Sequence, residues 1–420
     1  MKNILSIALV LCTLQMVVSQ TLSPIIKLHD GIQYSRLSAI DHIMKDYVDK
    51  NQLAGAVVMV VKDNQVVYHQ GHGYADLLSK KPMKPDAIFR IMSQTKAITS
   101  LAIMQLFERG KLDLDQRISD FIPEFKNPKL IKTFNAADSS YTSVPAASEI
   151  TFRDLLTHTS GISYPDIGID TMRAIYAKNG IPSGLGYFNE NLLTKMKALA
   201  NLPLLHNPGE RFTYGLNTDL LGALVEVICG QSLETYFQEH IFEPMGMKDS
   251  YFNVPASKSH RLPTVYTEDS NQKIIEWSPT FRNIDPAYPL IPKTYFSGGA
   301  GLSSTAYDYA IFLQMLLNGG TYNNKQILGR RTVALMLSPQ LADNFFGDDN
   351  FSLGFALTSQ KSANLRMRSE GSFAWGGYYG TTYWADPKEN LICLFLTQHT
   401  PNSHRDFEEK ITNVIYSSLK

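Results

Sequence analysis

The sequence predicts an α+β fold: an antiparallel sheet built from both ends of the chain and flanked by helices, with a mostly helical region inserted between the ends. Three observations predict it. Apolar, strand-like runs occur near the beginning of the chain and return near its end. Between them, helical segments alternate with long polar loops punctuated by proline. Amphipathic helices stand at both outer ends, where they can cover a sheet.

The first elements are an amphipathic helix and a β-hairpin. Residues 37–47 repeat apolar side chains at helical spacing. Residues 54–61 form an apolar run typical of a buried strand, and the chain turns at Asp63-Asn64 into a second strand over residues 66–69. A long helix then follows from Ser93 to Gly110, and it is apolar on nearly all sides, so we expect it to be buried.

The remaining chain divides into a helical middle and a strand-rich end. We expect one domain over residues 20–420, with a sheet lobe over about 36–105 and 286–420 and a helical lobe over about 106–285. Strand patterns return late in the chain, at residues 352–359, 367–370, 379–385 and 391–397. An amphipathic helix over residues 405–418 closes the chain.

The first nineteen residues are typical of a signal peptide. Lys2 supplies a positive start, an apolar core follows, and modest side chains precede a cut ahead of Gln20. Cys12 is preceded by Leu11 and not by a small residue, which argues against a lipidated N-terminus. We therefore predict an exported protein, periplasmic or secreted, without an integral membrane segment after processing.

Composition excludes several classes of function. The mature chain keeps Cys229 and Cys393, which we interpret as buried free thiols, with a disulfide between them left open. Lys and Arg balance Asp and Glu at 39 each and form no basic stripe, so nucleic acid is not an expected partner. The ten His residues show no metal-binding spacing, and we expect no metal and no cofactor.

Ser93 and Lys96 carry the strongest chemical signal. The pattern S-x-x-K occurs three times, and the copy at Ser93 opens the apolar helix. Residues three apart share a helix face, so the lysine amine can take the serine proton and make it a nucleophile. The alternative, an N-cap serine with a lysine whose amine reaches the surface, is equally compatible with this segment alone.

Two further segments are candidates for a binding site. Tyr214 follows a Pro-Gly-Glu turn and precedes a helix, so its hydroxyl can project into a cleft; the alternative is a packing residue. Gly376 and Gly377 lie between Trp375 and Tyr378 and permit close approach of a ligand to the backbone of an edge strand; the alternative is a bulge. Ser160, which follows a helical run, is interpreted as part of helix termination and loop packing.

Five segments, taken together and in order, resemble the serine β-lactamase and penicillin-binding-protein superfamily. The nearest similarity is to its class C β-lactamase-like branch, which includes carboxylesterases and D-alanyl-peptidases. The segments are residues 89–115 (FRIMSQTKAITSLAIMQLFERGKLDLD), 151–162, 207–226, 297–320 and 371–387. The resemblance covers roughly residues 36–418 and implies a β-lactamase/transpeptidase-like fold.

The resemblance also implies roles for individual residues. The S-x-x-K element is Ser93 with Lys96, and the Y-x-N element begins at Tyr214, but Asn217 stands one place late, so an amide-binding role is not carried over to it. The third element, usually K-T-G or H-x-G, is Trp375-Gly376-Gly377. Ser93 would be the nucleophile, with Lys96 and Tyr214 moving the proton, and either of the two as base. The oxyanion would lie between the N–H groups of Ser93 and Tyr378.

The resulting hypothesis is an exported serine hydrolase that forms an acyl-enzyme on Ser93 with a small ester, amide or peptide. Because Trp375 cannot supply the positive charge that attracts a substrate carboxylate, we favour a carboxylesterase-like activity. A cation from Arg366 or Arg368 would weaken that argument. The alternatives are a D-Ala-D-Ala or D-amino-acid peptidase, a weak β-lactamase, or a non-catalytic scaffold on the same fold.

Overall fold

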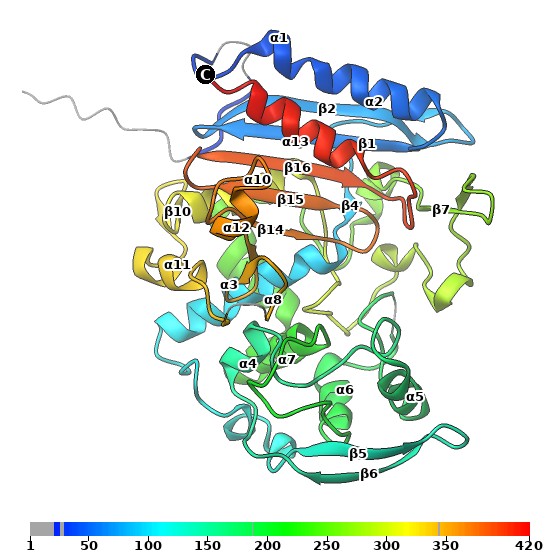
Figure 1. The fold of residues 1–420 in the computed structure, drawn as a ribbon, viewed down its shortest axis with the longest axis vertical. Coiled ribbons are helices and arrows are strands. Elements are labelled where there is room, and N and C mark those ends of the chain that lie inside the picture. Colours follow the sequence, from blue (N-terminus) through cyan, green and yellow to red (C-terminus); the bar gives the residue numbers. More distant parts are fainter. Residues whose placement is uncertain (1–20, 26–28, 187, 343–344) are drawn as a thin grey trace, which may run out of the picture.

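An antiparallel sheet organises the computed structural model, which describes residues 21–25, 29–186, 188–342 and 345–420. The signal-peptide prediction lies outside these residues. Within them, the sheet has eight strands in the order β12-β13-β14-β15-β16-β1-β2-β3, so strands from the two ends of the chain meet at its centre (Figure 1). The predicted fold class is confirmed.

The strands of this sheet are β1 (Gly55–Lys62), β2 (Gln65–Asp76), β3 (Lys81–Pro82), β12 (Asn350–Phe351), β13 (Ala356–Leu357), β14 (Phe373–Gly376), β15 (Thr382–Asp386) and β16 (Leu391–Thr397). Separate two-stranded pairs are β4 (Phe89–Arg90) with β9 (Ser303–Ser304), β5 (Lys129–Asn135) with β6 (Ser140–Pro145), β7 (Tyr266–Glu268) with β8 (Ile274–Glu276), and β10 (Thr321–Tyr322) with β11 (Lys325–Gln326). The helices are α1 (Tyr34–Leu37), α2 (Ala39–Asp49), α3 (Thr95–Glu108), α4 (Phe152–Leu156), α5 (Asp170–Lys178), α6 (Leu192–Leu199), α7 (Asn217–Cys229), α8 (Leu233–Phe237), α9 (Glu243–Met245), α10 (Ala306–Leu317), α11 (Arg330–Met336), α12 (Gln360–Ala363) and α13 (Phe407–Ser417).

Strand β1 is buried on both faces, which explains its continuous apolar run. It pairs with β2 on one side and with β16 on the other, where Val58 lies opposite Phe395. Val57 and Met59 belong to a core beneath the sheet, whereas Val58 and Val60 belong to a second core under α1, α2 and α13. A central strand covered on both sides needs apolar side chains in both directions.

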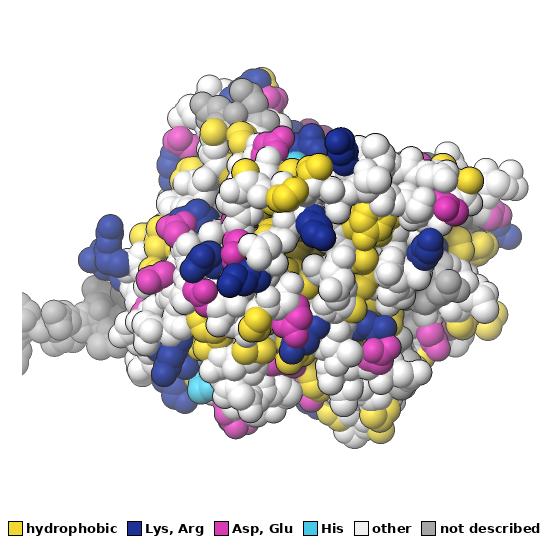
Figure 2. All heavy atoms as spheres, turned by 90° about the horizontal axis from the view of Figure 1, so that it is seen from below, with side chains coloured by type: hydrophobic (Ala, Val, Ile, Leu, Met, Phe, Trp, Pro, Cys, Tyr) yellow, Lys and Arg dark blue, Asp and Glu magenta, His cyan; other side chains and the backbone are white. Residues whose placement is uncertain are grey.

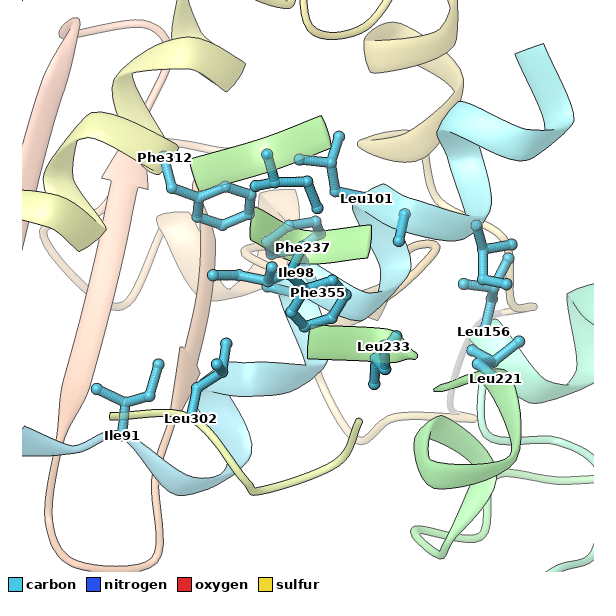
Figure 3. Packing of buried hydrophobic residues seen from close by; sticks show 14 of the residues in the cluster. Ile91, Ile98, Leu101, Leu156, Leu221, Leu233, Phe237, Leu302, Phe312 and Phe355 are labelled. Atoms are coloured by element: carbon cyan, nitrogen blue, oxygen red, sulfur yellow. The ribbon is translucent and has the colours of Figure 1, made fainter. Parts of the chain in front are cut away.

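Helix α3 lies in the middle of the larger core, as its sequence predicts. Every side chain from Thr95 to Leu106 is buried. Figure 3 shows Ile98 and Leu101 of α3 among Phe237 of α8 and Phe312 of α10. The helix begins at Thr95 and not at Ser93 as predicted; a helix surrounded by apolar neighbours is held in place, and with it the short turn before it that carries Ser93.

Three strand predictions need correction. Residues 367–370 form turns and no strand. Residues 352–359 do not form a continuous strand: the chain bends at Gly354, whose φ of 108° only glycine adopts readily, so that β12 ends before this segment and only β13 lies within it. The strand expected from residue 379 begins only at Thr382, because Gly380 N–H closes a turn onto Gly377 O.

The helical lobe contains strands that the sequence analysis missed. Its β5–β6 hairpin lies at the end of the molecule opposite α1 and α2 (Figure 1). The hairpin is half-exposed and mostly polar, so it lacks the apolar run by which the buried strands were recognised. Figure 2 shows this end of the molecule, where basic and acidic side chains are interspersed with apolar ones. The bounds of the two lobes stay a prediction.

Cys229 and Cys393 are both free thiols, as the sequence interpretation preferred, but only Cys393 is buried; Cys229, the last residue of α7, is partly exposed. Within the described part of the chain, no helix combines the length and apolarity that crossing a membrane requires.

Candidate active site

A cavity of about 370 Å³ lies where α3, the loop after α4 and the end of β14 meet. The sequence-predicted residues Ser93, Tyr214, Trp375, Gly376, Gly377 and Tyr378 line it. The other lining residues are Tyr164, Asp166, Ile167, Ser183, Leu185, Ala300, Thr381 and Arg405. The fold therefore brings residues from widely separated segments to one place.

Ser93 and Lys96 lie in contact at the cavity wall. Ser93 belongs to a 3₁₀ turn, Met92–Gln94, that leads directly into α3. Lys96 is only 3% exposed, and its Nζ lies 3.2 Å from Ser93 Oγ, 2.8 Å from Gly299 O and 2.9 Å from Tyr164 Oη. The alternative of a lysine reaching the surface is excluded, because the amine is enclosed.

Tyr214 joins this cluster through its ring. Lys96 Nζ lies 4.8 Å from the centroid of the Tyr214 ring. Trp375 Nε1 approaches the Tyr214 hydroxyl to 3.4 Å, and the two rings lie 5.6 Å apart. The hydroxyl thus faces Trp375 while the ring covers the amine.

Tyr164 was missed by the sequence analysis. It follows the 151–162 segment in the loop between α4 and α5, is 4% exposed, and its hydroxyl accepts from Lys96. Burial, followed by the neighbouring Tyr214 and Asp219, holds the pKa of Tyr164 well above its ordinary value, so the phenol keeps its proton. No sequence motif points to this tyrosine, because its partner Lys96 comes from a distant part of the chain.

Asp219 was also missed, although it stands in the quoted segment 207–226. Its carboxyl is completely buried in α7, and neither oxygen has a hydrogen-bond partner of normal geometry among the described residues. A Cβ on Gly299 would fall 2.6 Å from Asp219 Oδ2 and 3.4 Å from Lys96 Nζ, so the acid and the amine lie on the same side of this glycine. Burial raises the pKa of Asp219 to about 6, against the opposing influence of Ser297, Lys96 and the Gly299 N–H.

Asn217 lies behind the cavity and not in its wall. It is 0% exposed, its Nδ2 pairs with His158 Nδ1 at 2.8 Å, and its Oδ1 accepts from Ser160 Oγ. Ser160 is itself 0% exposed, which confirms its interpretation as a packing residue. The ring of His158 lies 4.9 Å from that of Tyr214, so this buried network supports the tyrosine.

The end of β14 forms the opposite wall. Strand β13 pairs with Phe373 and Ala374 only, which leaves Trp375 and Gly376 on a locally open edge. Gly377 needs to be glycine because a Cβ there would lie 2.3 Å from Ile91 O. The close approach that the sequence interpretation attributed to a ligand is, at Gly377, an approach of the protein's own backbone next to Ser93.

The cation at this cavity is not one of the two expected. Arg366 lies 3.9 Å from Asp349, and Arg368 stacks over Trp384; both line a separate groove beside α13. Arg405 lines the cavity instead, with its guanidinium paired to Glu408. Sequence reasoning could not place it, because Arg405 comes from the loop before the last helix.

The chain is similar to known proteins over most of its length. The family model described as Beta-lactamase matches residues 40–414. Esterase EstB of Burkholderia gladioli is 28% identical over 372 residues, which cover 86% of this chain and 90% of EstB. A putative D-alanyl-D-alanine carboxypeptidase of Escherichia coli is 26% identical over 398 residues, covering 88% of this chain and 84% of that protein.

Among solved structures, EstCE1, described as a hydrolase with promiscuous acyltransferase activity, superposes with a TM-score of 0.79 at 26% identity. The match covers 91% of this chain and 98% of EstCE1.

Proposed function

This chain belongs to the Beta-lactamase family and is a serine hydrolase, and we propose that it cleaves carboxylic esters through an acyl-enzyme formed on Ser93. The observation that carries the proposal is the 3.2 Å approach of Lys96 Nζ to Ser93 Oγ at the wall of the cavity. A serine hydroxyl is a weak nucleophile until a neighbouring base takes its proton.

The reaction follows from these positions. Ser93 Oγ bonds to the ester carbonyl carbon while its proton passes to the neutral amine of Lys96. The bond to the alcohol then breaks, and the alcohol leaves with that proton, delivered by Lys96 or by the hydroxyl of Tyr214 or Tyr164. Water repeats the same steps on the acyl-enzyme, and the carboxylic acid is released. Lys96 is the proposed base, because it is the group that contacts the nucleophile.

The negative charge on the carbonyl oxygen needs donors at the other wall. We assign them to the backbone N–H groups of Ser93 and Tyr378. Gly377 N–H already donates to Thr381 O at 2.7 Å, which leaves Tyr378, the next residue, to face the cavity. Losing one such donor typically costs about 3–4 kcal/mol of transition-state stabilisation.

The preference for esters rests on the cavity lining. Trp375 carries no charge, and its ring packs against Tyr214, whose ring packs in turn against Tyr164. Together with Leu185 these rings line the cavity, which suits an apolar acyl group. The similarity to an esterase and to a hydrolase with acyltransferase activity supports the same choice.

A specific observation favours a second candidate, the hydrolysis of a carboxylate-bearing peptide or β-lactam. Arg405 lines the cavity and could attract a carboxylate. Its charge is partly offset by Glu408, and its side chain is 48% exposed, so water screens it. We therefore rank hydrolysis of a carboxylate-bearing substrate below ester hydrolysis.

A substrate panel tests both candidates. It compares kcat/KM for p-nitrophenyl butanoate, a chromogenic cephalosporin and a D-Ala-D-Ala peptide, and we expect the ester to be turned over fastest. Arg405→Gln should leave ester turnover unchanged, whereas the second candidate requires that it slow the peptide. Trp375→Lys should shift relative kcat/KM towards the carboxylate substrates.

The nucleophile is tested separately. Ser93→Ala should abolish turnover and covalent labelling by a fluorophosphonate while the protein stays folded. Ser160→Ala is the matched control, and loss of the label from this variant instead would refute the assignment.

A further inference from the structure

Asp166 places a carboxylate in the cavity wall, and no side chain among the described residues pairs with its Oδ1. It stands two residues after Tyr164 in the loop before α5, and it is the one carboxylate among the described residues that line the cavity. Its Oδ1 is shielded from solvent and has no hydrogen-bond partner among the described residues. Such an atom loses its hydration without a replacement, which destabilises the empty site and calls for an explanation.

The neighbouring cations do not supply that partner. Arg282 donates from Nη1 to the Tyr378 hydroxyl at 2.6 Å, and Arg173 donates to Asp170 Oδ1 at 2.8 Å. Both act on Asp166 only through their charge. Burial outweighs these charges and the backbone N–H groups of Asp166 and Ile167, so the pKa of Asp166 is raised from its ordinary value. Since no cationic side chain forms an ion pair with it among the described residues, the carboxylate can pair with a group that enters the cavity.

The rest of the lining suits a positively charged group. The rings of Tyr164, Tyr214, Trp375 and Tyr378 line the same cavity. Lys96 lies over the first two rings and Arg282 over Tyr378, so Trp375 is the one of these four without a described cation over its face. Aromatic faces attract ammonium groups through their negative π-electron density, and a carboxylate beside them adds a charge-assisted hydrogen bond. Together they form the kind of surface that recognises an amine.

We propose that Asp166 and these rings form a subsite for an ammonium group, so that the preferred substrates are esters bearing a protonated or quaternary amine. This inference rests on the proposed function, which it extends by naming the class of substrate. Arg405, the cation in the lining, is paired with Glu408, which reduces its repulsion of a second positive charge.

The test uses two pairs of esters that differ only in charge. In the acyl part, methyl 6-aminohexanoate is compared with methyl heptanoate; in the alcohol part, butyrylcholine is compared with 3,3-dimethylbutyl butanoate. Acid release gives kcat/KM for the wild type, for Asp166→Asn and for Asp170→Asn. Asp170 is an exposed aspartate nearby, so its variant controls for a general loss of negative charge.

We expect the wild type to prefer the ammonium ester in at least one pair. In Asp166→Asn, kcat/KM for that ester should fall roughly tenfold or more, as for a lost hydrogen bond to a charged group, while its neutral counterpart changes by less than about twofold. Asp170→Asn should behave as the wild type, and Asp166→Glu should keep the preference. Melting temperature and fluorophosphonate labelling show whether each variant is folded.

Each outcome decides the proposal. If neutral esters are hydrolysed and Asp166→Asn leaves both ammonium esters at wild-type kcat/KM, the subsite is wrong and the proposed function stands. If Asp166→Asn does not fold, loss of the preference in Asp166→Glu, or equal rates for both members of each pair in the wild type, rejects the subsite. If the wild type hydrolyses no ester, the proposed function fails, and the subsite fails with it.

Discussion

Lys96 is the base in the proposed reaction. An ammonium has three N–H groups, and Ser93, Tyr164 and Gly299 provide three acceptors for them. With the amine neutral, two of these contacts persist and the lone pair faces the Ser93 hydroxyl. The same site can therefore satisfy the amine before and after it takes the proton, so the proposed proton transfer would require little rearrangement.

Asp219 should make both stability and rate depend on pH. Its pKa is about 6 in the folded protein and lies near the ordinary value of 3.8 in the unfolded chain. The folded state holds the proton more tightly, so ionisation destabilises it as pH rises from about 4 to 6. Two pKa units correspond to about 3 kcal/mol. Asp219→Asn should gain up to that amount in unfolding free energy, relative to wild type, between pH 4 and pH 7.

The same substitution should lower activity. An ionised Asp219 stabilises the ammonium that Lys96 becomes, so wild-type kcat/KM should fall as pH drops through about 6. In Asp219→Asn the fall of kcat/KM at low pH should be weaker, and kcat should fall roughly tenfold or more. Urea unfolding and pH–rate profiles measure both effects. A stability difference that is the same at pH 4 and pH 7 would show that the carboxyl is not the titrating group.

The two tyrosines should act as a unit with Lys96. Tyr214→Phe and Lys96→Ala should each lower kcat by on the order of 100-fold, and Tyr164→Phe should lower it as well, because each removes a group that holds or moves the proton. The double variant Tyr164→Phe/Tyr214→Phe should lose less than the product of the single losses. Tyr236→Phe, which loses a buried hydroxyl bonded to Gln105, is the control. An unchanged kcat in Tyr214→Phe would assign its hydroxyl a structural role only.

At the scale of elements, the site forms where the end of β14 is packed against the turn before α3. Thr381 Oγ1 donates to Ile91 O at 3.3 Å, and Gly377 lies close to the same carbonyl. The buried helix α3 fixes Ser93 from below, and β14 brings Tyr378 from above. The distance between Ser93 and Tyr378, the proposed nucleophile and oxyanion donor, is thus set by the packing of two elements and not by either one alone.

Gly377 should therefore be less replaceable than its neighbour. In Gly377→Ala the new Cβ would fall 2.2 Å from Thr381 Oγ1 and 2.3 Å from Ile91 O, so β14 must shift away from Ser93. We expect a loss of about 1–3 kcal/mol in unfolding free energy and a large fall in kcat. Gly376→Ala meets only Thr381 O, at 3.2 Å, and should keep most of its stability. Urea unfolding compares them, and equal stability of the two variants would contradict this account.

At the scale of the whole molecule, the two ends of the described chain are joined in one sheet. Strands from its beginning and end pair at the centre of the sheet, and the core beneath the sheet includes Met59 of β1, Leu221 of α7 and Leu394 of β16. Because that core joins both ends to the helical middle, the cavity at its edge exists only in the assembled protein.

The N-terminus should be processed without disturbing this assembly. The described chain is already attached near its start, since Leu22 N–H donates to Tyr322 Oη and Ser23 N–H to Asn64 O. We predict a mature N-terminus at Gln20 or within a few residues of it, without lipid on Cys12. N-terminal sequencing of exported protein is the measurement, and an intact Met1 or a lipidated Cys12 would contradict the prediction.

The sequence by itself determined the elements whose signals are local. Buried strands and helices such as β1, β16 and α3 are recognisable from their apolar runs. The contact of Ser93 with Lys96 follows from their helical spacing. The half-exposed β5–β6 hairpin was missed, because its residues bury little apolar surface and its pattern resembles a polar loop.

Tertiary structure alone decided which distant residues complete the site. Tyr164, Asp166, Asp219 and Arg405 reach the cavity or its lysine from three separate loops and helices. Their roles come from burial and from the partners that folding supplies, and neither quantity is encoded in the spacing of residues along a segment. The sequence therefore predicted Ser93 as nucleophile and left the base open between Lys96 and Tyr214, whereas the residues that surround them became visible only in the packed molecule.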